Sequence, residues 1–465
     1  MMEKLIFSVT CVFQIAVFAI MMYYFVLSFF GLHRKAEKKN YIPKNKFALI
    51  IAAHNEEIVI GKLIESLLNQ DYPRELFDVF VIADNCTDNT AKVARQYGVN
   101  VYERFNKVEK GKGVALEWMF NKLFKMQKKY DAVAIFDADN IVSKNWCKEI
   151  NSKMQEGYKV VQGYIDSKNP NDSWITSSYS IAFWTQNRMY QLARANLGLS
   201  NQIGGTGFAI DTGLLKEFGW GAKCLTEDLE FTCKIVLNGE KVGWAHDAII
   251  YDEKPLTLKQ SWVQRRRWMQ GFADVASRYF TKLVKKGFKE RKAYVLDCAL
   301  YVIQPFITIA MAISALLSFI GSYFPIGEDI FMMNYLVGNR VLMIITLIQF
   351  LMTPLILKLD KKISIGFFTM FVFYAVSTIV LPMFTKLLNY RGEIFLIELL
   401  FNLLFLASVF IILGKEKLKF FIRFLLYSFY TLTWVPITVE GIIKKNNKEW
   451  NPTKHVRNVE ILDMQ

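Results

Sequence analysis

The sequence has few of the residues that build compact metal or disulfide sites. Among its 465 residues are six cysteines, none of them in a C-x-x-C pair, and four widely separated histidines. This spacing predicts neither a zinc site nor a disulfide framework. A G-x-x-x-x-G-K-[ST] loop and a G-x-G-x-x-G fingerprint are also missing. P-loop hydrolysis and nicotinamide binding therefore lose their usual sequence support.

Charge is also sparse, whereas apolar residues are abundant. Only 21% of the residues are charged and 53% are hydrophobic, a balance that excludes intrinsic disorder and argues against an ordinary soluble protein. Lys and Arg number 57 against 42 Asp and Glu, so the net charge is +15. Such an excess suits nucleic acid, an anionic membrane surface or a phosphorylated substrate, and only its position along the chain discriminates among them.

The apolar residues gather in long runs that predict membrane segments. The first run, residues 5–32, exceeds the ~30 Å hydrocarbon thickness at ~1.5 Å per residue. Basic residues follow it from Arg34 to Lys46, so the positive-inside rule places the N-terminus outside and the following chain in the cytosol. Most of the positive charge flanks such runs, and no nucleic-acid partner is expected.

Further apolar runs follow at residues 294–320, 341–357, 363–384, 394–413 and 418–443. The charges between them fit four spans that begin and end in the cytosol. The fifth run carries Arg423, Pro436 and Glu440, so we expect it to be interfacial or broken. The predicted domains are an N-terminal anchor and basic linker (1–46), a cytosolic catalytic domain (47–255), an amphipathic interfacial region (256–293), C-terminal transmembrane or interfacial helices (294–443) and a cytosolic tail (444–465).

Short apolar runs alternate with helical periodicity across the cytosolic domain. Strands are predicted over 47–53, 79–83, 100–102 and 132–136, with a helix over 56–68. Strands that alternate with helices imply right-handed crossovers and a mainly parallel, doubly wound α/β sheet. Ligands of such sheets bind beyond the carboxyl ends of the strands. The residues that follow each strand are therefore the first candidates for a site.

Three of the predicted strand ends carry polar side chains. His54 and Glu56 follow the first strand, Asp84 ends the second, and Asp137-Ala-Asp139 follows the fourth. Carboxylates two residues apart on an extended chain point the same way, so Asp137 and Asp139 are expected to face one Mg²⁺ or Mn²⁺ ion. A solvated turn is the alternative for the D-x-D motif, and helix capping is the alternative for Asp84.

Three later motifs each have a functional and a structural interpretation. The glycines that flank Lys112 suit contact with phosphate, or a solvated loop. Thr226-Glu227-Asp228 precedes an apolar helix, which Thr226 is able to cap. Gln264-Arg-Arg-Arg-Trp268 lies in an amphipathic stretch, whose alternative role is a basic helix at a lipid surface.

Taken together and in this order, the motifs resemble those of family 2 glycosyltransferases. The matching elements are Asp84, the D-x-D of Asp137 and Asp139, the T-E-D of residues 226–228, and Q-x-x-R-W as Gln264, Arg267 and Trp268. They cover residues 47–271 and look most like the membrane-integrated synthases of cellulose, hyaluronan and chitin. Residues 161–163 and 169–174 look closest to bacterial exopolysaccharide synthases.

The resemblance implies a GT-A-type (Rossmann-like) catalytic domain and a role for each motif. His54, Glu56, Asp84, Lys112 and Asp137 would contact the nucleotide-sugar donor, and Asp139 would bind the metal. Asp228 would be the general base. The remaining motif residues would hold the diphosphate and the acceptor: Thr226, Glu227, Gln264, Arg267 and Trp268.

The resemblance further implies a multi-pass enzyme of the cell (inner or plasma) membrane whose catalytic domain is cytosolic. The expected activity is inverting, Mg²⁺- or Mn²⁺-dependent polymerisation of a β-linked exopolysaccharide from a nucleotide sugar, with a UDP-sugar as the expected donor and export through the membrane helices. One alternative is the addition of a single sugar to a lipid acceptor, and another is a non-catalytic transporter or scaffold. The segment 203–207 departs from the cellulose synthases, and residues 450–455 loosely resemble the family's terminal gating element.

Overall fold

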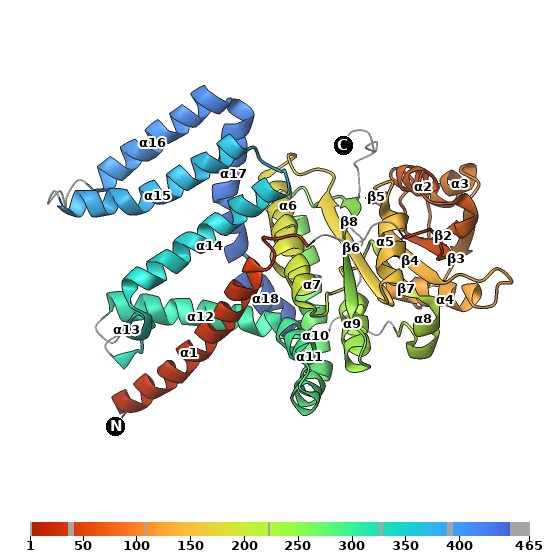
Figure 1. Ribbon diagram of the computed structural model, residues 1–465, viewed down its shortest axis with the longest axis horizontal. Helices are drawn as coiled ribbons and strands as arrows, with labels where there is room; N and C mark the ends of the chain where they lie inside the picture. The colour runs from red at the N-terminus through yellow and green to blue at the C-terminus, as the bar shows by residue number, and fades with distance from the viewer. Residues whose placement is uncertain are drawn as a thin grey trace.

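The computed structural model describes residues 2–35, 41–106, 108–221, 224–324, 329–387 and 394–446. A compact sheet domain lies beside a fan of long helices (Figure 1). The gating-element match at residues 450–455 and most of the expected tail lie outside the described residues.

The centre of the sheet domain is a mixed eight-stranded sheet with the strand order β3-β2-β1-β4-β7-β6-β8-β5. Its strands are β1 (Phe47–Ala53), β2 (Phe77–Asp84), β3 (Asn100–Arg104), β4 (Ala132–Asp137), β5 (Ile141–Val142), β6 (Val160–Ser167), β7 (Phe208–Asp211) and β8 (Val242–Asp252). The four strands predicted from the sequence are confirmed as β1 to β4, and they pair in parallel. The sheet is less uniformly parallel than predicted, because β7 runs antiparallel to both β4 and β6.

Alternate residues of β1 enter two different hydrophobic cores, one on each face of the sheet. Ala48 and Ile50 pack on one face, and Phe47, Leu49 and Ile51 on the other. All five are fully buried, which explains why this strand reads as a continuous apolar run. The GT-A-type arrangement of a helix-covered sheet follows from this two-sided burial.

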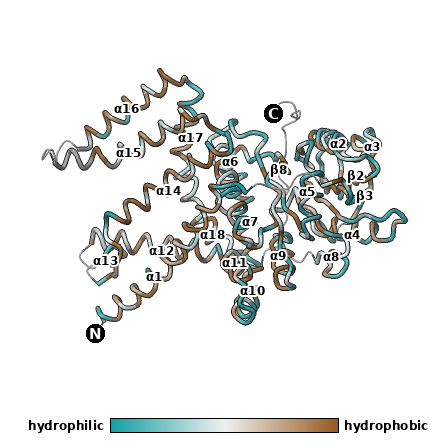
Figure 2. Tube along the Cα trace, in the orientation of Figure 1, coloured by the Kyte–Doolittle hydropathy of each residue, from teal (hydrophilic) through white to brown (hydrophobic). Residues whose placement is uncertain are grey.

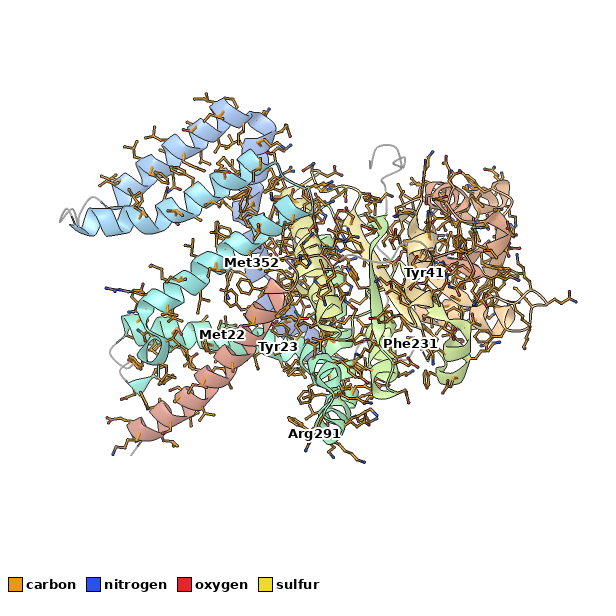
Figure 3. The ribbon with its side chains drawn as sticks, viewed as in Figure 1. Met22, Tyr23, Tyr41, Phe231, Arg291 and Met352 are labelled. Carbon is orange, nitrogen blue, oxygen red and sulfur yellow. The ribbon has the colours of Figure 1, made fainter. Side chains whose placement is uncertain are left out.

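Helices cover both faces of the sheet, and side chains such as Phe231 fill the space between the layers (Figure 3). The predicted helix over 56–68 begins later, at Ile60, because residues 54–59 form a turn. The helices of this domain are α2 (Ile60–Leu68), α3 (Thr90–Gln96), α4 (Lys112–Leu123), α5 (Trp146–Gln155), α6 (Trp174–Gln186), α7 (Ala193–Leu197), α8 (Thr212–Phe218) and α9 (Glu227–Leu237), with a 3₁₀ turn at Arg74–Leu76 and a π-helical segment at Asn187–Leu192.

A 33-residue helix, α10 (Leu258–Glu290), leads from the sheet domain to the apolar helices. The run predicted as one span from residue 294 is instead two helices, α11 (Ala293–Val302) and α12 (Gln304–Tyr323). Val295, Ala299 and Val302 of α11 belong to the core of the sheet domain. Periodicity does not separate a buried core helix from a membrane span, which is why the break at Ile303 was missed.

Figure 2 shows that the helices outside the sheet domain are strongly apolar. They are α1 (Met2–Phe29), α12, α13 (Asn334–Val337), α14 (Asn339–Leu359), α15 (Ile365–Leu387), α16 (Ile394–Leu413), α17 (Lys415–Leu432) and α18 (Trp434–Ile443). By length and composition, five segments are able to cross a membrane: Met2–Phe29, Gln304–Tyr323, Asn339–Leu359, Leu396–Leu413 and Lys415–Ile443. Within α15, the described segment Ile365–Thr378 is also apolar but is shorter than a span.

The last apolar run is broken, as predicted, between α17 and α18 at Thr433. It is nevertheless long and apolar enough to count among the five candidate spans. Its polar residues point to the catalytic domain, where Arg423 donates to the Asn171 carbonyl at 2.8 Å. Glu440 accepts a hydrogen bond from Trp262 on α10 at 2.7 Å. These contacts explain how charged residues are accommodated in an apolar segment.

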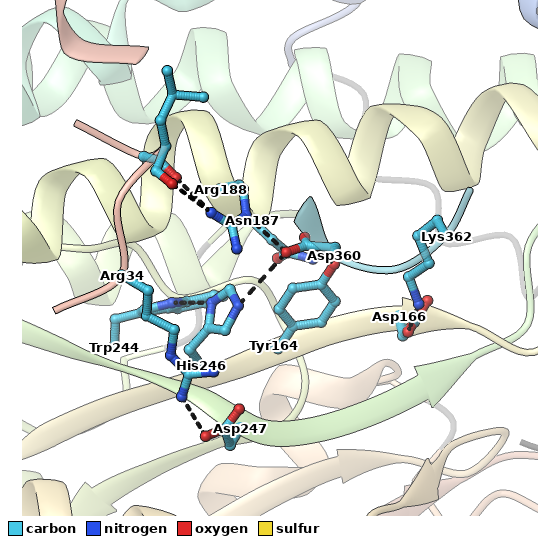
Figure 4. A network of polar contacts seen from close by, with 12 residues as sticks. Arg34, Tyr164, Asp166, Asn187, Arg188, Trp244, His246, Asp247, Asp360 and Lys362 are labelled. Carbon is cyan, nitrogen blue, oxygen red and sulfur yellow. Dashed lines mark hydrogen bonds and ion pairs between the residues drawn. The ribbon is translucent and has the colours of Figure 1, made fainter. Parts of the chain in front are cut away.

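A buried polar network joins the apolar helices to the sheet (Figure 4). Asp360, in the turn after α14, pairs with Arg188 at 2.7 Å and accepts from the Tyr164 hydroxyl at 3.1 Å. Lys362 in the same turn pairs with Asp166 at the end of β6, at 2.6 Å. Both Asp360 and Arg188 are buried, so this junction fixes the α14–α15 turn on the sheet.

Candidate active site

The first two strand ends lie together and share backbone contacts. The ring nitrogen Nδ1 of His54 is 2.7 Å from the carbonyl oxygen of Asp84. The amide of Glu56 donates to Thr90 Oγ1 at 2.8 Å, at the start of α3. Asp84 does not cap α3, because its carboxylate forms a buried ion pair with Arg104 at 2.6 Å. Arg104 was not predicted, since its position beside Asp84 depends on the β2–β3 register.

The two aspartates of the D-x-D motif have different surroundings. The chain after Asp137 is not extended, as the prediction assumed, because β4 ends at Asp137 and the amide of Asn140 closes a turn on the Asp137 carbonyl at 3.0 Å. The Asp137 side chain is 41% exposed. The Asp139 side chain is buried and accepts from the amide of Glu253 at 2.9 Å.

Lys112 links the D-x-D motif to the T-E-D motif. It begins α4, after Gly111 with a φ of 113°, and its ammonium donates to Asp137 Oδ1 and to the Gly205 carbonyl, both at 2.5 Å. Burial alone would lower the pKa of Lys112, but the carboxylates of Asp137, Glu227 and Asp228 outweigh it and raise that pKa. The lysine is therefore a fixed positive charge between the two acidic motifs.

Glu227 and Asp228 open helix α9, where both carboxylates are partly buried. Thr226 precedes them but forms no side-chain capping bond. Burial, together with the adjacent Asp228, raises the pKa of Glu227 to about 7. Burial also raises the pKa of Asp228, and this rise is opposed by the Leu229 amide, which donates to Asp228 at 2.8 Å, and by Lys112. Two neighbouring carboxylates thus have elevated proton affinity, as acid–base groups often do.

The Q-x-x-R-W motif lies on α10, and its residues face two sides. Arg267 is near enough to Glu227 to lower the pKa of that carboxyl. Gln264 accepts from the Tyr179 hydroxyl at 2.7 Å. Trp268 lies 6.1 Å from the Tyr179 ring and stacks with Trp434 of α18 at 6.4 Å between centroids. The helix therefore separates the acidic motifs from an aromatic cluster next to α17 and α18.

Further charged residues lie behind Asp139, at the ends of β6 and β8. Lys168 donates to the Asp139 carbonyl at 2.7 Å, and Lys254 pairs with Asp252 at 2.5 Å. Burial lowers the pKa of Lys168 and raises that of Asp252 to about 6. These residues were not predicted from the sequence, because β6 and β8 were not predicted as strands. The rule that ligands bind beyond the carboxyl ends of the strands would otherwise have identified them.

The donor atoms at the D-x-D motif suit a hard divalent cation that keeps much of its water. Among the described residues no group of three or more His, Cys, Asp and Glu side chains converges on one point. Asp137 is accessible, and Asp139 is held by backbone and amide donors. One or two carboxylates completed by water and phosphate oxygens is the usual environment of Mg²⁺, so the residues fit such an ion.

The fold and the protein family define this protein as a glycosyltransferase. Its fold is similar to that of a mannosyltransferase from Pyrobaculum calidifontis, solved in complex with GDP-Man and Mn²⁺, with a TM-score of 0.51 and 16% identity over 76% of this chain and 97% of that one. Residues 43–271 match the model described as glycosyltransferase like family 2. The protein is thus a nucleotide-sugar-dependent family 2 glycosyltransferase with several long apolar helices.

Curated relatives include enzymes with two kinds of product. A probable glycosyltransferase, YdaM of Bacillus subtilis, is 24% identical over 85% of this chain and 82% of its own length. A beta-monoglucosyldiacylglycerol synthase of Synechocystis is 28% identical over 50% of this chain, and a poly-beta-1,6-N-acetyl-D-glucosamine synthase of Staphylococcus epidermidis is 26% identical over 54%. The chain spans only 48% and 59% of the lengths of the last two.

Proposed function

We propose that this protein is an inverting, metal-dependent synthase that polymerises a β-linked polysaccharide from a nucleotide sugar and passes the product along its membrane helices. The main support is the placement of α10, with Arg267 near Glu227 and Trp268 in the aromatic cluster. An enzyme that extends a sugar chain needs its acceptor platform between the donor site and the membrane path, and α10 occupies that place.

In the proposed reaction the acceptor hydroxyl gives its proton to Asp228 as it attacks the anomeric carbon. The raised pKa of Asp228 suits this role, because a general base works best when its pKa approaches the working pH. Attack on the face opposite the leaving group inverts the anomeric carbon, so an α-linked donor gives a β-linked product.

The leaving diphosphate develops negative charge, and Lys112 and Arg267 are the cations we assign to it. Lys112 is held between Asp137 and Gly205, so it needs little reorganisation when the diphosphate arrives. Asp139 would hold Mg²⁺ or Mn²⁺, which would supply Lewis-acid stabilisation of the phosphate oxygens, and Asp137 would contact the donor. His54, Glu56 and Asp84 would contact the nucleotide, and Thr226, Glu227 and Gln264 would line the diphosphate and acceptor side.

A second candidate function is the transfer of one sugar to a membrane lipid. It is favoured by the relatives named beta-monoglucosyldiacylglycerol synthase, which match this chain at 28% identity over 241 residues. Both functions place the catalytic domain on the cytosolic side of the cell membrane, where nucleotide sugars are made. Both use the same donor residues, so only the acceptor distinguishes them.

The length of the product separates the two functions. Membranes that contain the full chain are incubated with each of a panel of UDP- and GDP-sugars, and the products are analysed by mass spectrometry. A ladder of β-linked sugars supports polymerisation, whereas a lipid that carries a single sugar overturns it in favour of the second candidate. Activity should also vanish in excess chelator, and full activity there would remove Asp139 from the metal role.

A further inference from the structure

The second residue of the Q-R-R-R-W sequence, Arg265, has an unusual environment. Its side chain is fully buried between α10 and the α17–α18 segment. Its Nε, Nη1 and Nη2 atoms have no hydrogen-bond partner anywhere in the described part of the chain. Buried guanidinium groups are normally paired, because a charge removed from water is stable only when ionic or hydrogen-bonding partners replace the water.

Two aromatic rings pack against this guanidinium. Its central carbon lies 4.2 Å from the centre of the Tyr430 ring and 4.9 Å from that of the Trp434 ring. Ring faces attract the positive charge, but they leave the N–H groups at the edge of the guanidinium plane without acceptors. Five donor hydrogens therefore remain for a ligand that approaches the edge.

Two buried hydroxyl groups lie on the same helix faces. Ser261 is one turn before Arg265 on α10, and Thr438 is one turn beyond Trp434 on α18. Both side chains are fully buried. Thr438 Oγ1 has no hydrogen-bond partner among the residues described, and the Ser261 hydroxyl lies beside those of Tyr179 and Tyr430. Arginine and hydroxyl donors together are the chemistry that recognises phosphate oxygens.

The nearest acidic residue on α18 does not neutralise Arg265. Glu440 accepts from Trp262 at 2.7 Å and pairs with Arg266 at 2.8 Å and Lys444 at 2.7 Å. It is thus surrounded by two other cations on the outer side of the same helices. Any counter-charge for Arg265 has to come from outside the described chain.

The opposite face of the α17–α18 segment is apolar and exposed. It carries Phe429, Leu432, Val439 and Ile443, which are 64%, 66%, 40% and 75% exposed. A segment that is apolar enough to enter a membrane and has such a face lies against lipid. Arg265 is therefore about one helix diameter, roughly 10 Å, from the bilayer. Its Tyr and Trp neighbours are the residues that gather at lipid headgroups.

We propose that Arg265, Ser261 and Thr438 bind the phosphate group of an anionic membrane lipid that inserts between α10 and α18. The lipid would hold α18 against the helix that carries Gln264 and Trp268, so the site would couple the acceptor platform to the composition of the membrane. This proposal concerns a ligand that is neither donor nor acceptor, and its test does not depend on the product that the enzyme makes.

Lipid binding is measured by the thermal stability of the full chain in neutral detergent. Phosphatidylglycerol, phosphatidylcholine and inorganic phosphate are titrated separately, and the apparent Tm is recorded. Phosphatidylglycerol is expected to raise the Tm by about 4 °C or more and the two other probes by much less, since a ligand that binds only the folded state stabilises it by mass action.

The variant Arg265→Gln should bind phosphatidylglycerol at least about tenfold more weakly. Lys285→Gln, which removes an exposed positive charge from the same helix, is the matched control and should keep the wild-type response. The double variant Ser261→Ala, Thr438→Val keeps the guanidinium and its stacking, and it should weaken binding by about fivefold.

A response of Arg265→Gln equal to that of the wild type would overturn the site. If inorganic phosphate stabilises the protein as much as phosphatidylglycerol does, the ligand of the site is a free phosphate anion and the lipid proposal is overturned. If Arg265→Gln does not fold, the double variant decides, because an unchanged affinity there also contradicts the proposal.

Discussion

Adjacent carboxylates with different partners stand at the start of α9. Lys112 acts on both carboxylates, but only Asp228 accepts a hydrogen bond from the Leu229 amide, and Arg267 lowers the pKa of Glu227. Gly205 lies next to Asp228, because a Cβ at this position would be 3.4 Å from Asp228 Oδ2, and its φ of 83° favours glycine.

Replacing Asp228 by Asn should remove the proposed base without changing its size. We expect transfer to fall by about 10³-fold, within the range for loss of a general base, and the affinity for the donor to change by less than about twofold. Turnover of labelled donor and calorimetric binding of the nucleotide measure the two effects. Glu217→Gln, on the exposed side of α8, is the control. Normal turnover in Asp228→Asn would contradict the assignment.

The raised pKa of Glu227 makes stability depend on pH. The pKa of a glutamate in the unfolded chain is near 4.5, whereas the pKa of Glu227 in the folded protein is about 7. Stability contributed by this residue therefore falls as pH rises through that window, because the folded state binds the extra proton. Glu227→Gln should stabilise the protein at pH 8 by on the order of 1–3 kcal/mol and have little effect at pH 4.

The measurement is the apparent Tm of the two proteins in detergent between pH 4 and pH 8. Glu230 provides a control of opposite sign, because Arg278 outweighs burial there, pairs with Glu230 at 2.6 Å and lowers its pKa. Glu230→Gln should destabilise the protein at neutral pH, and this effect should shrink as the pH falls. A Tm difference for Glu227→Gln that does not change with pH would be inconsistent with the raised pKa.

At the scale of elements, helix α10 is packed unusually closely on the start of α9. A Cβ at Gly271 would lie 2.3 Å from Thr226 Oγ1 and 2.4 Å from its Cγ2. Real Cβ contacts are never so short, so the two helices depend on glycine at this position. This contact sets the distance between the Q-x-x-R-W and T-E-D motifs.

The variant Gly271→Ala should therefore push Arg267 away from the acidic motif. We expect kcat to fall by about 10²-fold, as small misplacements in an active site do, with a smaller effect on the Tm. Steady-state kinetics in membranes measure the change. Gly366→Ala in α15, where the added Cβ meets nothing within 4 Å, is a matched substitution that should leave kcat unchanged. Unaltered kcat in Gly271→Ala would refute the role of this contact.

The elements most predictable from sequence are those whose environment is uniform. Strand β1 is buried on both faces, so its unbroken apolar run is sufficient to identify it. Helix α11 is as apolar as a membrane span but packs in the sheet domain, a distinction that only tertiary contacts make. Arg104, the partner of Asp84, was not predicted because the register of β2 and β3 was unknown. The pair Asp252–Lys254 was not predicted because strand β8, which ends at Asp252, was not predicted.

The direction of side chains was harder to predict than the position of motifs. A turn begins at Asp137, so the D-x-D motif is not the extended segment that the prediction assumed. The motif residues themselves do gather at one edge of the sheet, as the strand-end rule expects for parallel strands. Their chemical roles remain proposals that the variants above test.

At the scale of the whole molecule, the junction around Asp360 joins the sheet to the apolar helices (Figure 4). Asp360→Asn would leave the buried Arg188 without its counter-charge. We expect a loss of about 3–5 kcal/mol of stability, the usual cost of breaking a buried ion pair. Thermal unfolding in detergent tests this effect.

The matched control is Asp247→Asn, which breaks a pair with Arg34 that is 34% and 24% exposed. Because water already screens this second pair, its loss should cost less than about 1 kcal/mol. Similar Tm shifts for the two variants would show that the Asp360 junction is not the stronger connection.

Helix α1 does more than attach the enzyme to a bilayer. Arg188 donates to the carbonyl oxygens of Gly31 and Leu32, just after α1. Tyr23, which is labelled on α1 in Figure 3, donates to Asp297, the buried partner of Arg194. A shortened chain that starts at the sheet would lack these residues. Arg188 would lose two carbonyl acceptors, and the Asp297–Arg194 ion pair would lose the hydroxyl donor of Tyr23. Efforts to produce a soluble catalytic fragment should therefore retain the first 35 residues.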